Sequence, residues 1–242
     1  MPVSLKDKVA LVVGASSGVG RATALLLARE GAKVMASARR KDRLAELKKE
    51  AEAEGLAIDA FVADASDAGQ MEALAAAAAK RFGNVNILVY ATGTNTPDRA
   101  MQRLSPPVWN ELIATNLSGA YYITHAVLPA MRAARDGHLI YVSSISSFLT
   151  DLSGAAYQAS KRGMVGFAHA VRHEEKGNNI RTTVVNPGLI DTEILEKRPV
   201  KPTAELLAQA LLPEHVAEAI VACARMHPQG VVTEMTLSPT AI

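Results

Sequence analysis

The chain has 242 residues, of which 49% are hydrophobic, and its 26 Lys and Arg residues nearly balance 24 Asp and Glu residues. This composition fits one large α/β domain, residues 1–242, with a sizeable core, and it excludes a globally disordered chain. The net charge of +2 gives no argument for a nucleic-acid or membrane partner, and we expect neither. Cys223 is the single cysteine, so we expect no disulfide within the chain. The apolar run near the N-terminus is too short for a signal peptide, and we expect a cytoplasmic protein.

Apolar runs rich in Val and Ile alternate along the chain with amphipathic, Ala-rich stretches. The apolar runs predict strands at 8–13, 33–38, 57–62, 86–90, 138–143, 180–186 and 232–237. The amphipathic stretches predict helices near 19–30, 42–54, 67–82, 107–134, 154–176 and 214–226. Strand–helix alternation of this kind predicts an α/β fold with a Rossmann-like, doubly wound, seven-stranded parallel sheet and helices on both faces.

A glycine-rich turn, GASSGVG, joins the first predicted strand to the first predicted helix. Glycines at Gly14, Gly18 and Gly20 allow a tight turn and a close approach of a pyrophosphate to the backbone. Ser16 and Ser17 add hydroxyl donors, and the helix N-terminus adds unpaired N–H groups and a positive dipole end. The alternative is an ordinary tight turn, because the spacing is G-x-x-x-G-x-G rather than the commoner G-x-G-x-x-G.

The stretch SGAAYQASKRG places Tyr157 four residues before Lys161 on a predicted helix. Residues at this spacing share one helix face. A fixed cation beside a phenol favours the phenolate and lowers its pKa, which would make Tyr157 a proton donor and acceptor nearer to neutral pH. By itself the pair is also explained by chance.

A histidine pair and a long irregular stretch are two further features of the sequence. His169 and His173 have metal-ligand spacing on one predicted helix, but no third ligand is evident, and we expect no metal site. The longest stretch without a regular pattern, 187–203, follows a predicted strand and contains three prolines. Loops of this length are often binding loops, so we expect a substrate loop or lid near 189–212.

In order and spacing over nearly the whole chain, these motifs resemble the short-chain dehydrogenase/reductase family. The family's glycine pattern and its Y-x-x-x-K motif match the two stretches described above. Its remaining motif positions fall, in chain order, on Asp64, Asn116, Ser144, Pro187, Gly188 and Thr192.

The resemblance implies two sets of site residues. The catalytic set is Asn116, Ser144, Tyr157 and Lys161. The cofactor-binding set is Gly14, Ser16, Ser17, Gly18, Val19, Arg39, Arg40, Asp64, Ala65, Ala91, Gly93, Tyr157, Lys161, Pro187, Gly188, Ile190 and Thr192.

The implied reaction is hydride transfer between a nicotinamide and the carbonyl carbon of a small-molecule ketone, aldehyde or alcohol. Tyr157 would move the proton, and Lys161 would lower its pKa and hold the nicotinamide ribose. Ser144 would hydrogen-bond the substrate oxygen, with Ser143 as a rival one position away. Asn116 would hold a water that links Lys161 to solvent.

The end of the second predicted strand, SARRKD, bears on which dinucleotide is bound. Enzymes of this fold that use NAD place an acidic residue there, and here that position is Ala38. Arg39 and Arg40 follow, and a guanidinium binds a 2′-phosphate where a carboxylate would repel it. We therefore expect NADP(H), the alternative being that both arginines are solvated charges at a helix start.

The same fold also carries other functions. A non-catalytic dinucleotide sensor is the main alternative, although such a protein has no need of both Tyr157 and Lys161. An epimerase or dehydratase of the extended relatives would need a longer substrate domain after Gly188. The long helices predicted at 107–134 and 154–176 resemble the pair that builds family dimers and tetramers, so we expect a homodimer or homotetramer.

The sequence departs from the family pattern at two places. The family's N-N-A-G after the fourth strand is replaced by YATG, Tyr90 to Gly93, and we expect Tyr90 to be a buried structural replacement with its hydroxyl bonded, rather than a ring stacked on the cofactor. The C-terminal stretch GVVTEMTLSPTAI differs from that of the fatty-acid-synthesis ketoacyl reductases and is more similar to members that act on hydroxy acids, including 3-hydroxy amino acids.

Overall fold

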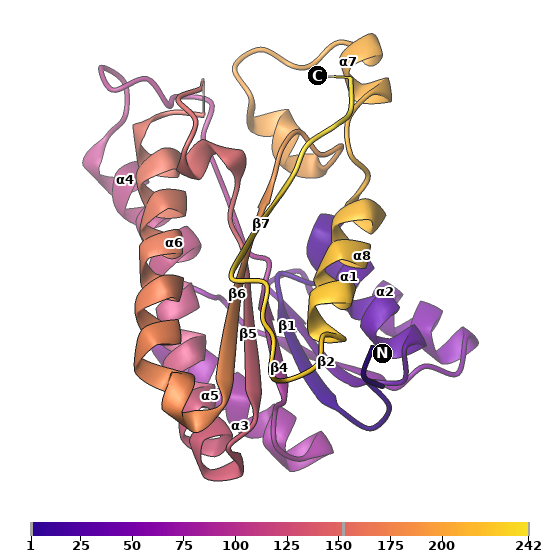
Figure 1. Cartoon of the computed structure of the whole chain (residues 1–242). Helices are drawn as coiled ribbons and strands as arrows, with labels where there is room; N and C mark the ends of the chain where they lie inside the picture. Colours follow the sequence, from indigo (N-terminus) through magenta and orange to yellow (C-terminus); the bar gives the residue numbers. More distant parts are fainter. Residues whose placement is uncertain (1, 152, 242) are drawn as a thin grey trace.

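The computed structural model describes residues 2–151 and 153–241, which build one parallel sheet with helices on both sides (Figure 1). Its strands are β1 (Val9–Val13), β2 (Lys33–Ala38), β3 (Ile58–Val62), β4 (Ile87–Tyr90), β5 (Gly137–Val142), β6 (Ile180–Pro187) and β7 (Glu234–Leu237). They lie side by side in the order β3-β2-β1-β4-β5-β6-β7, and each neighbouring pair is parallel. The predicted seven-stranded, doubly wound fold is confirmed.

The helices divide between the two faces of the sheet (Figure 1). One face is covered by α1 (Gly18–Arg29), α2 (Lys41–Ala53) and α8 (Pro213–Ala224), which share one hydrophobic core with the sheet. The other face is covered by α3 (Ala68–Phe82), α5 (Gly119–Ala134) and α6 (Ala155–Glu175), which share a second core. A shorter helix, α4 (Pro106–Ile113), contacts α6.

Strand β1 shows why the inner strands are continuous apolar runs. Ala10 and Val12 belong to one core, whereas Leu11 and Val13 belong to the other, because successive side chains point to opposite faces. With helices on both faces no side chain of this strand reaches solvent, and all five of its residues are buried. The edge strand β7 lacks this cover, has alternating exposed residues, and is shorter than the predicted 232–237.

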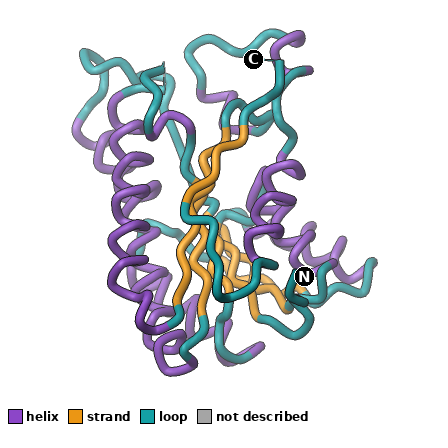
Figure 2. The backbone as a smooth tube through the Cα atoms, viewed as in Figure 1, coloured by secondary structure: helices purple, strands orange, loops and turns teal. Residues whose placement is uncertain are grey.

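The chain reverses its direction of travel across the sheet between β1 and β4. From β1 it proceeds outward to β2 and β3, and after returning to β4 it proceeds the other way to β7. The loops that follow β1 and β4 therefore diverge, and a crevice opens at the carboxyl ends of these strands. Figure 2 shows long loops gathered at that end of the molecule, above the strands.

The prediction of one continuous helix over 107–134 is wrong in one respect. Between α4 and α5 the backbone forms a π-helical turn, Ala114–Ser118. The hydroxyl of Tyr90 donates to the backbone carbonyl of Thr115, and the side chain of Asn116 bonds the backbone of Thr94. Both contacts come from β4 and the loop after it, so the helical pattern itself carries no sign of the turn.

The segment predicted as a substrate loop near 189–212 is tied together at its base. Ile190 and Leu211 form a parallel bridge, in which Asp191 N–H donates to the Leu211 carbonyl and Leu211 N–H donates to the Leu189 carbonyl, each at 2.9 Å. Between them lie a 3₁₀ helix, Glu193–Lys197, and the short helix α7 (Ala204–Ala208). We call residues 191–210 the lid; in Figure 1 it lies beyond the carboxyl end of the sheet. Among the described helices, none is both long and apolar enough to cross a membrane.

Candidate active site

A cleft of about 540 Å³ lies at the carboxyl ends of the strands, between the loops after β1, β2, β4 and β5 and the lid. Every residue that the sequence assigned to cofactor binding lines this cleft, and so do Ser144, Tyr157 and Lys161. Asn116 does not line it. The tertiary structure thus brings together predicted residues from seven separate segments of the sequence, while their individual roles stay predictions.

The glycine turn has the conformation that its sequence suggested. Gly14 and Gly18 have φ values of +94° and +52°, a region that favours glycine. A Cβ atom at Gly20 would lie 2.2 Å from the Gly14 carbonyl oxygen, so the turn and the first helical turn are in direct backbone contact. Ser17 is the N-cap of α1, but its side chain makes no capping bond, and no acidic residue lies in the first turn. The helix N-terminus therefore presents N–H groups and a positive dipole end to the cleft, which suits an anion.

The end of β2 places two guanidinium groups beside the glycine turn. Arg40 donates to the hydroxyl oxygens of Ser16, at 3.0 Å, and Ser17, at 2.6 Å, and pairs with Glu193 of the lid at 2.7 Å. Arg39 is 62% exposed and lies 3.7 Å from Asp64. Burial raises the pKa of Asp64, but bonds from Ser66 and the charge of Arg39 outweigh it, and the pKa is lowered. No carboxylate occupies the Ala38 position, so the donors at this end of the cleft are cationic.

The structure separates the two candidate serines after β5. Ser143 is 3% exposed and its hydroxyl donates to the backbone carbonyl of Lys161 at 3.0 Å, so it is a structural contact. Both serines line the cleft, but Ser144 is the one that hydrogen-bonds the phenol of Tyr157, which lowers the pKa of that phenol. The geometry therefore supports Ser144 and not its neighbour.

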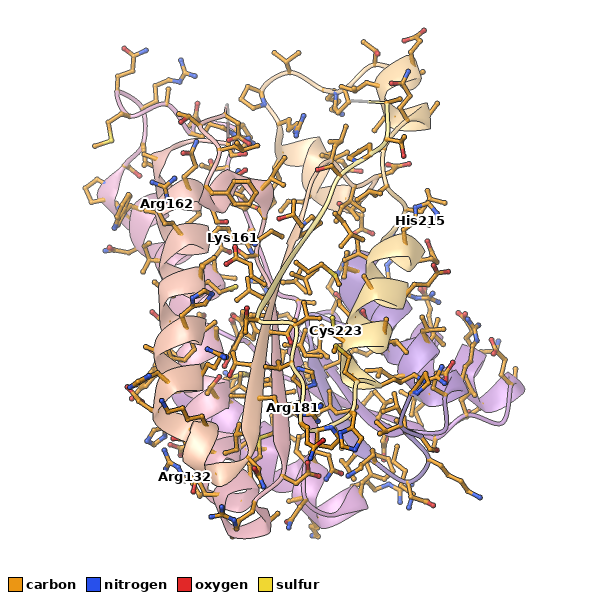
Figure 3. All side chains as sticks on the ribbon, viewed as in Figure 1. Arg132, Lys161, Arg162, Arg181, His215 and Cys223 are labelled. Atoms are coloured by element: carbon orange, nitrogen blue, oxygen red, sulfur yellow. The ribbon has the colours of Figure 1, made fainter. Side chains whose placement is uncertain are left out.

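Lys161 lies between α6 and the sheet, below the lid (Figure 3). Its Nζ donates to the Val142 carbonyl oxygen at 2.9 Å, and a Cβ atom at Gly93 would lie 3.3 Å from that nitrogen. The side chain is 3% exposed, and burial lowers its pKa to about 8. Ammonium and neutral amine are therefore both accessible near neutral pH.

The expectation that the pKa of Tyr157 is lowered is wrong for the structure as it stands. Burial raises the pKa of the phenol, and this effect outweighs the lowering by the hydrogen bond to Ser144. Asp151 also raises it, while Arg198 and Arg99 lower it. The Lys161 Nζ lies 5.8 Å from the centre of the tyrosine ring and is directed to a backbone carbonyl. Tyr157 is accordingly a neutral phenol at physiological pH.

Asn116 lies behind the cleft wall at the π-helical turn and is fully buried. Its side-chain oxygen accepts from Thr94 N–H at 2.8 Å, and its amide donates to the Thr94 carbonyl and to the Ser160 hydroxyl, each at 3.0 Å. These bonds anchor the loop after β4 to α6. In this arrangement Asn116 is a positioning residue, and its part in a water relay stays a prediction.

Tyr90 meets the expectation of a buried structural residue. Its side chain is fully buried, its hydroxyl donates to the Thr115 carbonyl at 2.5 Å, and it is absent from the cleft lining. A Cβ atom at Gly119 would lie 2.3 Å from the hydroxyl oxygen, so the phenol fits against a residue that has no side chain. The alternative of a ring stacked on the cofactor finds no support in this geometry.

Sequence reasoning missed several residues of the cleft. Arg99 comes from the loop after β4, Lys197 and Arg198 come from the lid, and Asp151 comes from the loop before α6. Each belongs to an irregular segment, where neither periodicity nor motif spacing indicates where a side chain points. Within the described residues there is no group of three His, Cys, Asp or Glu side chains that could hold a metal ion.

Comparison with known proteins shows the family of the chain. Residues 8–203 match the family described as short chain dehydrogenase. The chain is 35% identical to the 3-oxoacyl-[acyl-carrier-protein] reductase FabG of Thermotoga maritima over 90% of each protein, and 34% identical to the uncharacterized oxidoreductase Lmo0432 of Listeria monocytogenes over 99% of each.

Solved structures resemble the whole chain. A metagenomic short-chain oxidoreductase in complex with NADP superposes with a TM-score of 0.86 and 29% identity, covering 99% of this chain and 100% of the other. A variant of the actinorhodin polyketide ketoreductase with NADPH superposes with a TM-score of 0.88 and 28% identity, covering 99% and 98%. The fold, the site geometry and these similarities agree, and the chain is an oxidoreductase of the short-chain dehydrogenase/reductase family.

Proposed function

We propose that the protein transfers a hydride between NADP(H) and the carbonyl carbon of a small ketone or aldehyde, or the corresponding alcohol. The observation that carries the proposal is the convergence of Ser144, Tyr157 and Lys161 in one cleft with the uncapped N-terminus of α1. The first three groups suit proton transfer at a substrate oxygen, and the last suits a dinucleotide phosphate. The relatives include a ketoacyl reductase, the type from which the C-terminal stretch differs, so this similarity does not identify the substrate.

The residues present fit NADP(H) better than NAD(H). The backbone N–H groups after Gly18 and the hydroxyls of Ser16 and Ser17 would hold the pyrophosphate. Arg39 and Arg40 would hold the 2′-phosphate, because both line the cleft and no carboxylate occupies the Ala38 position. The two solved relatives described with NADP and NADPH support this choice.

When bound, the nicotinamide supplies or accepts the hydride, and the side chains of this chain handle the proton and the charge. In reduction the substrate carbonyl oxygen gains negative charge, which the Ser144 hydroxyl stabilises by donating a hydrogen bond. Tyr157 then transfers its phenolic proton to that oxygen, and in oxidation it accepts the proton back. Lys161, held by the Val142 carbonyl beside Tyr157, supplies positive charge that favours the transient phenolate.

The test is a Tyr157→Phe variant, which keeps the ring and removes only the transferable proton. NADPH oxidation with a panel of ketones, aldehydes and oxo acids measures turnover, and fluorescence titration measures NADPH binding. Turnover should fall at least about 100-fold, because acid–base catalysis supplies about 10²–10⁴-fold, while the NADPH dissociation constant should stay within about twofold. Tyr121→Phe, on an exposed part of α5, is the matched control. A variant with more than about a tenth of the wild-type rate would refute the proton-donor role.

We also propose a homodimer or homotetramer that pairs α5 and α6 with their copies. In support, Tyr121, Tyr122, His125 and Phe167 form an aromatic cluster on these helices, and Tyr121 is 50% exposed. An exposed aromatic cluster of this kind is unusual on a face that only meets water. Light scattering of the protein and of Tyr121→Ser tests this, and a monomeric wild-type protein would refute it.

A further inference from the structure

The lid carries charges of both signs, and the structure places them at different parts of the molecule. At the cofactor end Glu193 is paired with Arg40. Glu196 and Lys201 line a neighbouring hollow and do not line the cleft itself. The other charged lid residues that line the cleft are Lys197, which bonds Thr94, and Arg198, whose charge acts on the Tyr157 phenol. The lid therefore presents positive charge to the reacting end of the cleft, which its sequence alone leaves open.

A third cation, Arg99, joins them from the loop after β4. Its guanidinium donates to the Thr96 carbonyl at 2.9 Å and to the Lys197 carbonyl at 2.6 Å, so it ties the lid to this loop. Arg99 is only 8% exposed, and burial, followed by the charge of Arg198, lowers its pKa against the opposing effect of Asp151. Two guanidinium groups are thus held within electrostatic range of each other, an arrangement that an anion would stabilise.

These cations are close to the reacting group. The charges of Arg198 and Arg99 both act on the Tyr157 phenol. Lys197 Nζ donates to the Thr94 hydroxyl at 2.5 Å, and Thr94 is the residue that Asn116 clamps through its backbone. The positive wall and the proton donor therefore line one cleft.

One carboxylate, Asp151, opposes the cations on this wall. It accepts from the Ser146 hydroxyl at 2.7 Å and from Ser153 through the backbone N–H at 2.8 Å and the hydroxyl at 3.0 Å. Its negative charge is thus directed into its own serine-rich loop. The described wall keeps three cations, Arg99, Lys197 and Arg198, against one carboxylate, and this excess of positive charge suits an anionic substrate.

We propose that Arg99, Lys197 and Arg198 form a subsite for a carboxylate of the substrate, so that the protein reduces oxo acids and oxidises hydroxy acids. This rests on the proposed function, and it adds the class of substrate. A planar guanidinium binds a carboxylate through two parallel hydrogen bonds, which would fix the carbonyl at a set distance from Tyr157 and Ser144. Ser144 and Tyr157 would bind the oxygen that reacts, and the cationic wall would bind the acid end.

The kinetic test compares each acid with its uncharged ester. NADPH oxidation is measured with 2-, 3- and 4-oxopentanoate and with their methyl esters, in wild-type protein and in Arg198→Gln. For the acid with the right spacing, wild-type kcat/KM should exceed that of the ester by about 10–100-fold, the range for a charged hydrogen bond. The ratio should fall towards one in Arg198→Gln, and should be unchanged in Lys201→Gln, which removes a lid charge outside the cleft. Equal or ester-favouring ratios throughout the series would overturn the proposal.

A binding test makes the inference independent of turnover. Calorimetric titration of pentanoate and of the uncharged pentanamide into the protein with saturating NADP⁺ measures the subsite directly. Pentanoate should bind at least about 10-fold more tightly, and this difference should be lost in Arg198→Gln and weakened by salt. Equal affinities would overturn the carboxylate subsite even if the hydride reaction proceeds. Absence of turnover with every compound would refute the proposed function, and the titration then decides the subsite by itself.

Discussion

The Tyr90 hydroxyl tests how the buried residues behind the cleft stabilise the candidate site. Tyr90 ends β4, its side chain is fully buried, and its hydroxyl donates to the Thr115 carbonyl in the π-helical turn next to Asn116. Tyr90→Phe keeps the ring in the core and leaves that carbonyl without the phenol. Loss of one bond to a buried group costs about 1–3 kcal/mol of unfolding free energy. Tyr90→Ala removes the ring as well and should cost about 3–5 kcal/mol.

The matched control is Tyr141, the residue opposite Tyr90 in the register of β4 and β5. Tyr141 is also fully buried, and its hydroxyl bonds the Thr124 hydroxyl at 2.6 Å, away from the π-helical turn. Tyr141→Phe should therefore destabilise the protein by a similar amount. Only Tyr90→Phe should also reduce turnover, because the turn that Tyr90 holds carries Asn116, which clamps the loop after β4.

Urea unfolding of the apo protein, followed by circular dichroism, measures the stability change, and the NADPH assay and titration measure function. Both Phe variants should unfold at a lower urea concentration, because each loses a buried hydrogen bond that contributes about 1–3 kcal/mol to the unfolding free energy. The NADPH dissociation constant should stay within about twofold, because neither tyrosine lines the cleft. An unchanged midpoint together with weakened NADPH binding in Tyr90→Phe would refute the reasoning and place Tyr90 in the cofactor site.

Three further predictions follow from the cleft. Arg39→Asp should raise the NADPH dissociation constant by the equivalent of about 1–3 kcal/mol and shift the cofactor preference towards NADH. Values of kcat/KM for NADPH and NADH measure this preference. Equal values in the wild-type protein would contradict the assignment of NADP(H) as the cofactor. The raised pKa of Tyr157 keeps the phenol protonated at and above neutral pH. The rate of reduction should therefore persist into alkaline pH, while the rate of oxidation, which needs the phenolate, should rise with pH. A pH–rate profile in which the oxidation rate is already constant at neutral pH would contradict this prediction. Burial holds the pKa of Lys161 at about 8, against 10.5 in an exposed lysine. Between these two pH values the unfolded chain binds a proton that the folded chain has lost. The unfolding free energy should therefore rise with pH, by about 3 kcal/mol over this range. The slope should disappear in Lys161→Met, which urea unfolding at pH 7 to 10 would show.

Much of the site could be predicted because its signals are local. The glycine turn depends on the backbone freedom of Gly14 and Gly18, which no other residue type replaces easily, and it adjoins the strand and helix that position it. Tyr157 and Lys161 are one helical turn apart, so their shared face follows from their spacing. Ser144 was harder, because a shift of one residue reverses the direction of the side chain, and the bond from Ser143 to the Lys161 carbonyl decides between the two.

The pKa of Tyr157 illustrates what spacing cannot supply. Sequence spacing indicates that a cation lies one turn away, and Coulomb attraction alone lowers the pKa of a phenol. The structure adds burial, the charge of Asp151, and the direction of the Lys161 ammonium towards the Val142 carbonyl, and together these reverse the sign. The size and direction of such a shift depend on neighbours that come from other segments of the chain.

The sequence by itself determined the sheet, the glycine cradle and the Tyr–Lys pair, because buried parallel strands are continuous apolar runs and the motifs lie within single turns. Only the tertiary structure decided the π-helical turn and the positive wall of the cleft. Ala114–Ser118 widens where Tyr90 and Thr94 bond it. Arg99 bonds the Lys197 carbonyl of the lid only after two irregular loops converge over the carboxyl end of the sheet. Such loops have no periodicity, so the position of their charges depends on the contacts that the folded chain makes.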